Sequence, residues 1–101
     1  MYNVVYLPTA RKQFMDAAIY IAMELRAPDA AERLLDDVDA AVASLREMPY
    51  RHALYPTLYA MKREIRFIPI RNYLLFYVVK EQEHTVEIWR FLHQRQNTGK
   101  L

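Results

Sequence analysis

The sequence predicts a two-layer α+β fold, in which an N-terminal strand and an antiparallel helix hairpin precede a three-stranded antiparallel meander (β-α-α-β-β-β). Between residues 10 and 48, apolar residues recur at steps of three and four, which is the period of helices with one buried face. After residue 62 the chain contains runs rich in β-branched and aromatic residues, which are typical of strands. With 101 residues the chain has the size of one domain, so we expect residues 1–101 to fold as a single unit.

The first two elements are expected to be a short strand and a helix. Residues 2–7 are rich in β-branched and aromatic side chains and are followed by Pro8, which predicts a strand that ends there. Thr9 offers a hydroxyl as the N-cap of a helix over residues 10–25. The apolar face of this helix consists of Phe14, Ala18, Ile21 and Leu25.

A second helix is predicted from Pro28 to about Met48, and it has the clearest pattern in the chain. Pro28 and Asp29 suit a first turn, because proline needs no amide partner there and the aspartate faces the positive end of the helix dipole. The apolar stripe consists of Leu34, Leu35, Val38, Ala41, Val42 and Leu45. Two consecutive helices with a short joint and one apolar face each should form a hairpin that covers a further surface.

The rest of the chain is expected to supply that surface as a sheet. Residues 51–60 show no period and contain Pro56, which indicates a loop. Three strands are predicted, over residues 62–68, 73–80 and 85–92, with joints short enough for hairpins at 69–72 and 81–84. The middle strand is apolar on both faces, so we expect helices on one side of it and another cover on the opposite side.

The composition excludes several classes of protein. The chain has no cysteine, which removes disulfide frameworks and thiolate metal sites and fits a reducing compartment. No signal-peptide pattern or bilayer-length apolar run is present, so we expect a cytoplasmic protein without membrane contact. The three histidines are far apart in the sequence and there is a single glycine, so we expect no metal site, no phosphate-cradling loop and no cofactor.

Charge is distributed unevenly along the chain. The net charge of +2 indicates little about partners, but the carboxylates cluster between residues 29 and 47. The cations that follow this cluster include Arg51, Lys62, Arg63, Arg66, Arg71, Arg90, Arg95 and Lys100. The C-terminal half is therefore the predicted anion-binding half.

Several segments follow one another in a pattern that resembles a known family. The second predicted helix begins with PDAAERL (residues 28–34) and ends with LREMP (residues 45–49). The segment RFIPIRNYLLFY (residues 66–77) places an arginine seven residues before a tyrosine and continues into an apolar strand that ends in tyrosine. The last predicted strand lies in VEIWRFLHQR (residues 86–95). In order and spacing these segments resemble the RelE/ParE superfamily of toxins from type II toxin-antitoxin systems, which includes plasmid stabilisation proteins.

The resemblance implies a toxin that inhibits bacterial growth and is neutralised by a cognate antitoxin protein. In this family the complex commonly represses its own operon, so operator DNA would be contacted only through the antitoxin. One branch of the superfamily cleaves messenger RNA on the ribosome, and another inhibits DNA gyrase without a catalytic site. The first hypothesis for this chain is messenger-RNA cleavage, and the alternatives are gyrase inhibition and a non-toxic binding subunit of a repressor complex.

The ribonuclease hypothesis needs a base, a proton donor and cations that stabilise the charge developing on the phosphate. The catalytic candidates are Arg66, His93 and Tyr77. Arg66 could hold a phosphate, His93 could transfer protons near neutral pH, and Tyr77 could stack on a base or donate a hydrogen bond. Each could instead be structural, Arg66 in a salt bridge, His93 at the surface and Tyr77 in the core. The candidates for binding RNA or phosphate are Lys62, Arg63, Arg90 and Arg95.

Overall fold

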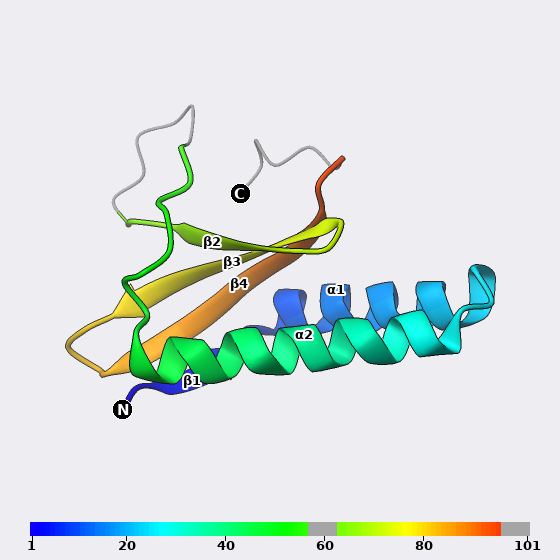
Figure 1. The fold of residues 1–101 in the computed structure, drawn as a ribbon. Coiled ribbons are helices and arrows are strands. Elements are labelled where there is room, and N and C mark those ends of the chain that lie inside the picture. Colours follow the sequence, from blue (N-terminus) through cyan, green and yellow to red (C-terminus); the bar gives the residue numbers. More distant parts are fainter. Residues whose placement is uncertain (57–62, 96–101) are drawn as a thin grey trace.

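A computed structural model describes residues 1–56 and 63–95, which form a four-stranded sheet with a helix hairpin on one face (Figure 1). The first elements are β1 (Asn3–Tyr6), α1 (Pro8–Ile19), the π-helical turn η1 (Tyr20–Glu24) and α2 (Pro28–Glu47). The remaining strands are β2 (Arg66–Ile70), β3 (Tyr73–Lys80) and β4 (Thr85–His93). The predicted α+β fold and its order of elements are confirmed.

The strands lie in the order β1-β4-β3-β2. The last three form the predicted antiparallel meander, with Phe67 opposite Phe76 and Leu75 opposite Phe91. β1 joins β4 in parallel orientation, with Val4 beside Val86. The local pattern of residues 2–7 predicts a strand but not its partner, because this pairing joins opposite ends of the chain.

The start and the end of the first helix differ from the expectation. Pro8 occupies the first turn of α1, and Leu7 stands at the N-cap without a side-chain hydrogen bond, so Thr9 lies inside the helix and does not cap it. Proline is favoured in a first turn because the amide hydrogen that it lacks would have no helical partner. From Tyr20 the helix widens into the π-helical turn η1, which the three- and four-residue spacing did not predict.

The larger part of the core lies between the helix hairpin and the sheet. The buried side chains of α2 are Ala31, Leu34, Val38, Val42 and Leu45. They belong to one cluster with strand residues that include Leu75, Tyr77, Val86, Ile88 and Phe91. Each large aliphatic side chain buried in this way contributes about 1.5–3 kcal/mol, so the α2 stripe is a main source of stability.

The outer face of the sheet is covered by an irregular segment, residues 48–56, which we call the strap. It leaves the end of α2 and passes the edge of β2, where Leu54 forms a β-bridge with Arg66 (Figure 1). The Tyr55 N–H donates to Ile65 O at 2.7 Å, and the Tyr55 ring packs edge-on against Phe76 with centroids 4.9 Å apart. The strap is therefore part of the second cover that the apolar middle strand predicts.

The boundaries of β2 also differ from the expectation. The strand begins at Arg66, after the exposed charged residues Arg63 and Glu64, and Lys62 lies outside the described residues. It continues through Pro69, which an edge strand tolerates, so the connection to β3 is shorter than predicted. Arg71 adopts a left-handed conformation in this turn, with φ of 55°.

A β-bulge in β4 changes which side chains face the helices. Tyr77 pairs with Ile88 and Phe76 pairs with Arg90, so Trp89 is the extra residue. Ile88 therefore contributes to the core under the helices, while Trp89 packs in the cluster on the outer face.

Candidate functional site

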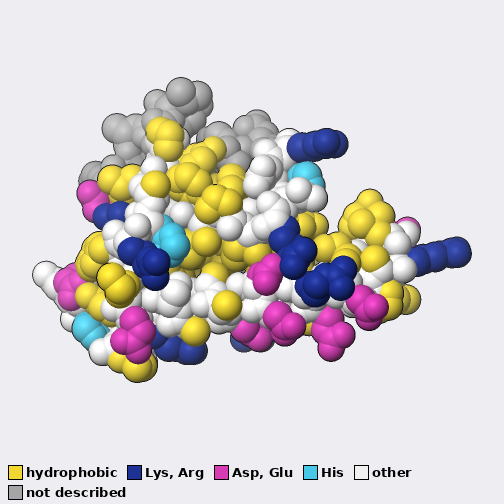
Figure 2. Space-filling view, in the orientation of Figure 1, with side chains coloured by type: hydrophobic (Ala, Val, Ile, Leu, Met, Phe, Trp, Pro, Cys, Tyr) yellow, Lys and Arg dark blue, Asp and Glu magenta, His cyan; other side chains and the backbone are white. Residues whose placement is uncertain are grey.

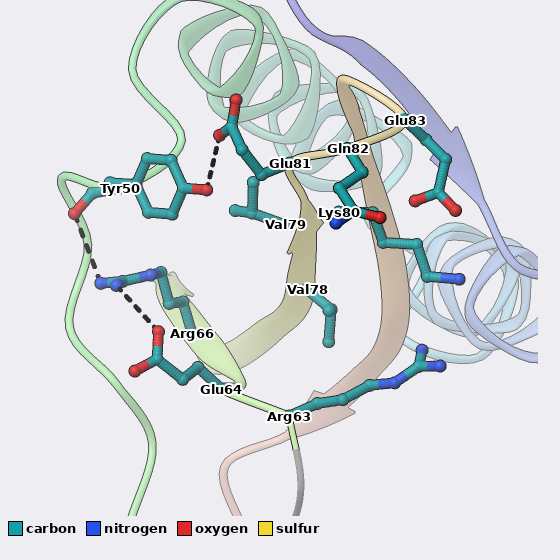
Figure 3. Close-up of a pocket in the computed structure, with 10 residues that line it drawn as sticks. All are labelled: Tyr50, Arg63, Glu64, Arg66, Val78, Val79, Lys80, Glu81, Gln82 and Glu83. Carbon is teal, nitrogen blue, oxygen red and sulfur yellow. Dashed lines mark hydrogen bonds and ion pairs between the residues drawn. The ribbon is translucent and has the colours of Figure 1, made fainter.

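A pocket lined by two of the predicted arginines, Arg63 and Arg66, lies where β2 stops short of the end of β3. Arg66 is opposite Tyr77, so β2 offers no partner to residues 78–80, and a pocket of about 430 Å³ opens beside them (Figure 3). The charged residues of its wall are Arg63, Arg66, Lys80, Glu64, Glu81 and Glu83. With three cations and three carboxylates, the pocket combines both signs of charge and does not form a purely anion-binding surface.

Arg66 fastens the strap to the start of β2. Its Nη1 donates to His52 O at 2.7 Å and to Tyr50 O at 3.3 Å. The guanidinium carbon lies 5.3 Å from the centre of the Tyr50 ring, and Nη2 is 3.7 Å from the carboxylate of Glu64. The Arg66 side chain is only 16% exposed. The guanidinium thus binds two carbonyl oxygens of the protein itself.

Tyr77 of β3 binds the strap at Pro49. Its ring is fully buried, and its hydroxyl donates to Pro49 O at 2.6 Å. Burial raises the pKa of Tyr77 to about 12, so the hydroxyl keeps its proton at neutral pH. In this position the ring has no exposed face on which a nucleobase could stack.

His93 lies at the opposite end of the sheet from Arg66. It is the last residue of β4, opposite Tyr73, and its Nδ1 accepts a hydrogen bond from the Arg95 N–H at 3.1 Å. The strand register separates the backbones of Arg66 and His93 by about 13 Å along the strands and about 10 Å across them. The structure therefore does not bring these two catalytic candidates together.

The predicted phosphate-binding residues divide between two places. The Arg63 guanidinium lies 5.7 Å from the centre of the Trp89 ring, and Arg90 Nη1 donates to Trp89 O at 2.7 Å. Arg95 is exposed in the turn after β4, beside His93. Lys62 lies outside the described residues. Among the described candidates, Arg63 and Arg90 contact the same residue, Arg63 at the Trp89 ring and Arg90 at the Trp89 carbonyl oxygen.

A cluster around Glu81 was not predicted from the sequence. One oxygen of Glu81, Oε1, accepts hydrogen bonds from the hydroxyls of Tyr2 and Tyr50, both at 2.7 Å. These bonds lower the pKa of Glu81, and the bond from Tyr50 raises the pKa of that tyrosine to about 12. The Tyr2 ring also stacks on His84, with centroids 4.0 Å apart. No local signal predicts the cluster, because it joins the residue before β1, the strap and the β3–β4 turn.

His52 was also not predicted as a site residue. Its Nε2 is buried and has no hydrogen-bond partner among the described residues. Burial lowers the pKa of His52, and the charges of Arg51 and Arg66 lower it further, so the ring is neutral at neutral pH. The imidazole packs edge-on against Tyr77 with centroids 6.2 Å apart, which makes it part of the packing under the strap.

Metal and membrane sites were also sought in residues 1–56 and 63–95. Within these ranges no three His, Cys, Asp or Glu side chains are close enough together to hold a metal ion. Within the same ranges no helix has the length and apolar character needed to span a bilayer.

The chain and its structure were compared with known proteins. Residues 4–98 match the model of the family described as the ParE toxin of type II toxin-antitoxin system, parDE. The search of curated proteins gave no match.

Two solved structures share the fold. A chain of the chromosomal ParDE toxin-antitoxin system from P. aeruginosa is 16% identical, with a TM-score of 0.71 over 92% of this chain and 96% of that one. A metal-bound toxin from Helicobacter pylori is 19% identical, with a TM-score of 0.57 over 92% and 94% of the two chains. At these identities the structures support the fold, whereas the family match spans nearly the whole sequence. The chain therefore belongs to the ParE toxin family of type II toxin-antitoxin systems.

Proposed function

We propose that this chain is a growth-inhibiting toxin that acts by binding DNA gyrase and is neutralised by a cognate antitoxin. The family match supports the toxin and its antitoxin partner. The choice of target depends on one observation, which is that the catalytic candidates do not converge. Arg66 and Tyr77 bind carbonyl oxygens of the strap, while His93 lies at the far end of the sheet.

Messenger-RNA cleavage would need these groups around one phosphate. General acid-base catalysis requires the base and the acid within hydrogen-bond reach of the reacting oxygens, and charge stabilisation requires cations aimed at the same phosphate. In the structure the Arg66 guanidinium points to the carbonyl oxygens of the strap and not toward His93. We therefore assign Arg66 and Tyr77 as positioning residues that hold the strap. Arg63, Arg90 and Arg95 remain candidates for sequence-independent attraction of an anionic partner.

The first experiment tests whether the chain is a toxin. The chain is expressed in bacteria with and without the reading frame of the antitoxin beside its gene. Growth arrest that the antitoxin relieves is the expected result. Normal growth without the antitoxin would contradict the proposal and favour a binding subunit that contacts operator DNA only through the antitoxin.

The same cultures separate the two targets. Primer extension on messenger RNA after induction should show intact transcripts while growth stops. New 5′ ends inside ribosome-bound codons would contradict gyrase binding as the mechanism and support the ribonuclease hypothesis. The variant Arg66→Met removes the donor to both carbonyl oxygens and keeps an apolar stem, so it tests whether the strap is needed for toxicity.

A further inference from the structure

A second hollow, distinct from the pocket beside β3, lies between α1 and the ends of β3 and β4. We call it the α1 groove. It has a volume of about 470 Å³, and most of its lining is apolar. The residues that matter here are Asp16, Ala17, Tyr20, Tyr73, Phe91 and His93.

The base of the groove is held by packed aromatic rings and a hydrogen bond between β4 and α1. The Tyr73 and Phe91 rings stack with centroids 4.9 Å apart, and Phe14 packs edge-on against Phe91 at 5.4 Å. The Phe91 N–H donates to Gln13 Oε1 at 2.8 Å, which ties β4 to α1. The groove is therefore a formed feature of the fold, with aromatic walls held by both layers.

Asp16 gives this aromatic groove a negative charge. Its carboxylate binds Lys12 at 2.7 Å, and the two side chains are 60% and 77% exposed. An exposed pair four residues apart on a helix contributes little, so an incoming cation can replace Lys12. A guanidinium or ammonium group that enters the groove would meet both a carboxylate and the half-exposed ring of Tyr20, and cations favour such an environment.

The surface around the groove is apolar at positions where a helix that no partner covers would normally carry polar side chains. On either side of Tyr20 along the chain, four more apolar side chains of α1, η1 and the residue after η1 are about half or more exposed. These are Met15 (49%), Ile19 (56%), Met23 (71%) and Leu25 (56%). Figure 2 shows hydrophobic surface at the protruding end of the helix hairpin. Because α1 also packs apolar side chains into the core, it is apolar on more than one side. Such a helix, next to an exposed apolar patch, is typical of a surface that a partner covers.

We infer that the α1 groove and this patch form the docking surface of the antitoxin, and that the antitoxin inserts an arginine or lysine beside Asp16. The inference depends on the proposed function, because it takes the partner to be the antitoxin. The negative charge of Asp16 and the aromatic walls favour a basic side chain in the groove. The patch favours apolar antitoxin residues beside that basic side chain. The antitoxin segment is thus an apolar one that carries a basic residue.

A second copy of this chain fits the surface less well. The patch consists of five exposed side chains, whereas a standard interface takes roughly 20–30 residues from each partner. A stable interface takes about 800 Å² from each partner. The concave groove must therefore be filled as well, which suits an inserted segment better than the convex patch of another copy.

The test uses Asp16→Asn, with Asp36→Asn as its control. Asp36 is an exposed carboxylate on α2 and does not line the groove, so both variants lose the same charge. Binding of the antitoxin encoded beside the gene is measured by titration calorimetry at two salt concentrations. We expect Asp16→Asn to weaken binding about tenfold or more and to lower its salt dependence, and Asp36→Asn to bind as the wild type does.

Growth assays and sedimentation complete the test. Asp16→Asn should still arrest growth but escape neutralisation by the antitoxin. Unchanged antitoxin affinity would overturn the inference. Lost toxicity with unchanged affinity would also overturn it, because the surface would then belong to the toxin's target. Sedimentation that finds a dimer of the wild-type chain but a monomer of Ile19→Asp would overturn it too, because the patch would then bind a second copy of the chain. If the wild type arrests no growth, the proposed function fails, while calorimetry still reports on the groove.

Discussion

Three side chains hold the strap to the sheet by hydrogen bonds, and two of them, Tyr77 and Arg66, satisfy carbonyl groups that follow the end of α2. The last carbonyl groups of a helix and those that follow it have no helical partner, so other donors must satisfy them. Tyr77 donates to Pro49 O, Arg66 donates to His52 O and Tyr50 O, and Tyr50 in turn donates to Glu81. At the scale of residues, the strap is thus ordered by two donors from the strands, Tyr77 and Arg66, and by an acceptor in the β3–β4 turn, Glu81.

The bond from Tyr77 should be measurable as stability. Tyr77→Phe keeps the ring but leaves Pro49 O without its buried donor, so the free energy of unfolding should fall by about 1–3 kcal/mol. Urea denaturation measures this change. Tyr20→Phe, which removes the same hydroxyl from a half-exposed ring, should change stability by less than about 0.5 kcal/mol. Equal effects of the two variants would show that the Tyr77 bond contributes nothing.

The cluster around Glu81 should make stability depend on pH at both ends of the scale. The pKa of Glu81 is lowered from 4.5, so its contribution is present above that value and is lost as the pH falls through the lowered pKa. The pKa of Tyr50 is raised from 10.0 to about 12, so its contribution is present below 10.0 and is lost as the pH rises through about 12.

The matched variant for this prediction is Glu81→Gln. Urea titrations should show the largest difference in stability from the wild type between the two pKa values, with the difference shrinking toward either extreme. A difference that does not vary with pH would mean that the two hydrogen bonds do not depend on the carboxylate charge.

The two helices differ in how their apolar residues are used, and this is a property of whole elements. α2 buries one stripe and exposes a polar face, so Leu34 is 1% exposed. α1 has apolar side chains on its core side and on its solvent side, where Ile19 is 56% exposed. The stability of the isolated chain therefore comes mainly from α2, while part of the α1 surface is left for binding.

A pair of truncations tests this difference. Leu34→Ala should lower the free energy of unfolding by about 2–5 kcal/mol, because it leaves a cavity in the core. Ile19→Ala should change it by less than about 0.5 kcal/mol. Thermal or urea unfolding of both variants gives the comparison. A large loss for Ile19→Ala would mean that the outer side of α1 supports the isolated fold.

The elements with strong periodicity were predictable, and those that depend on distant contacts were not. The α2 helix and β3 were predicted nearly to the residue, because one has a clear helical stripe and the other an uninterrupted apolar run. The β1–β4 pairing, the bulge at Trp89 and the strap depend on contacts between distant segments. Arg66 was predicted inside a strand over residues 62–68, and it is the first residue of β2. Its partners could not be predicted, because they are backbone carbonyls of a loop without a sequence signature.

At the scale of the whole molecule, the surfaces available to partners lie at separate places. The strap lies along one side of the sheet, and the end of the helix hairpin protrudes beyond it (Figure 1). The pocket beside β3 is lined in part by Tyr50 of the strap. In the view of Figure 2, carboxylates lie along the side of α2 with Lys or Arg side chains among them, and Arg71 forms an ion pair with Asp37 there. This mixed charge is less suited to the phosphates of a nucleic acid than a continuous basic surface would be.

Supercoiling by purified DNA gyrase, with increasing amounts of the chain, tests the proposed target most directly. We predict that the wild-type chain inhibits supercoiling and that equimolar antitoxin restores it. Asp16→Asn should inhibit equally but resist the antitoxin, since its loss affects neutralisation only. Full supercoiling activity with an excess of folded, growth-inhibiting toxin would contradict the gyrase mechanism.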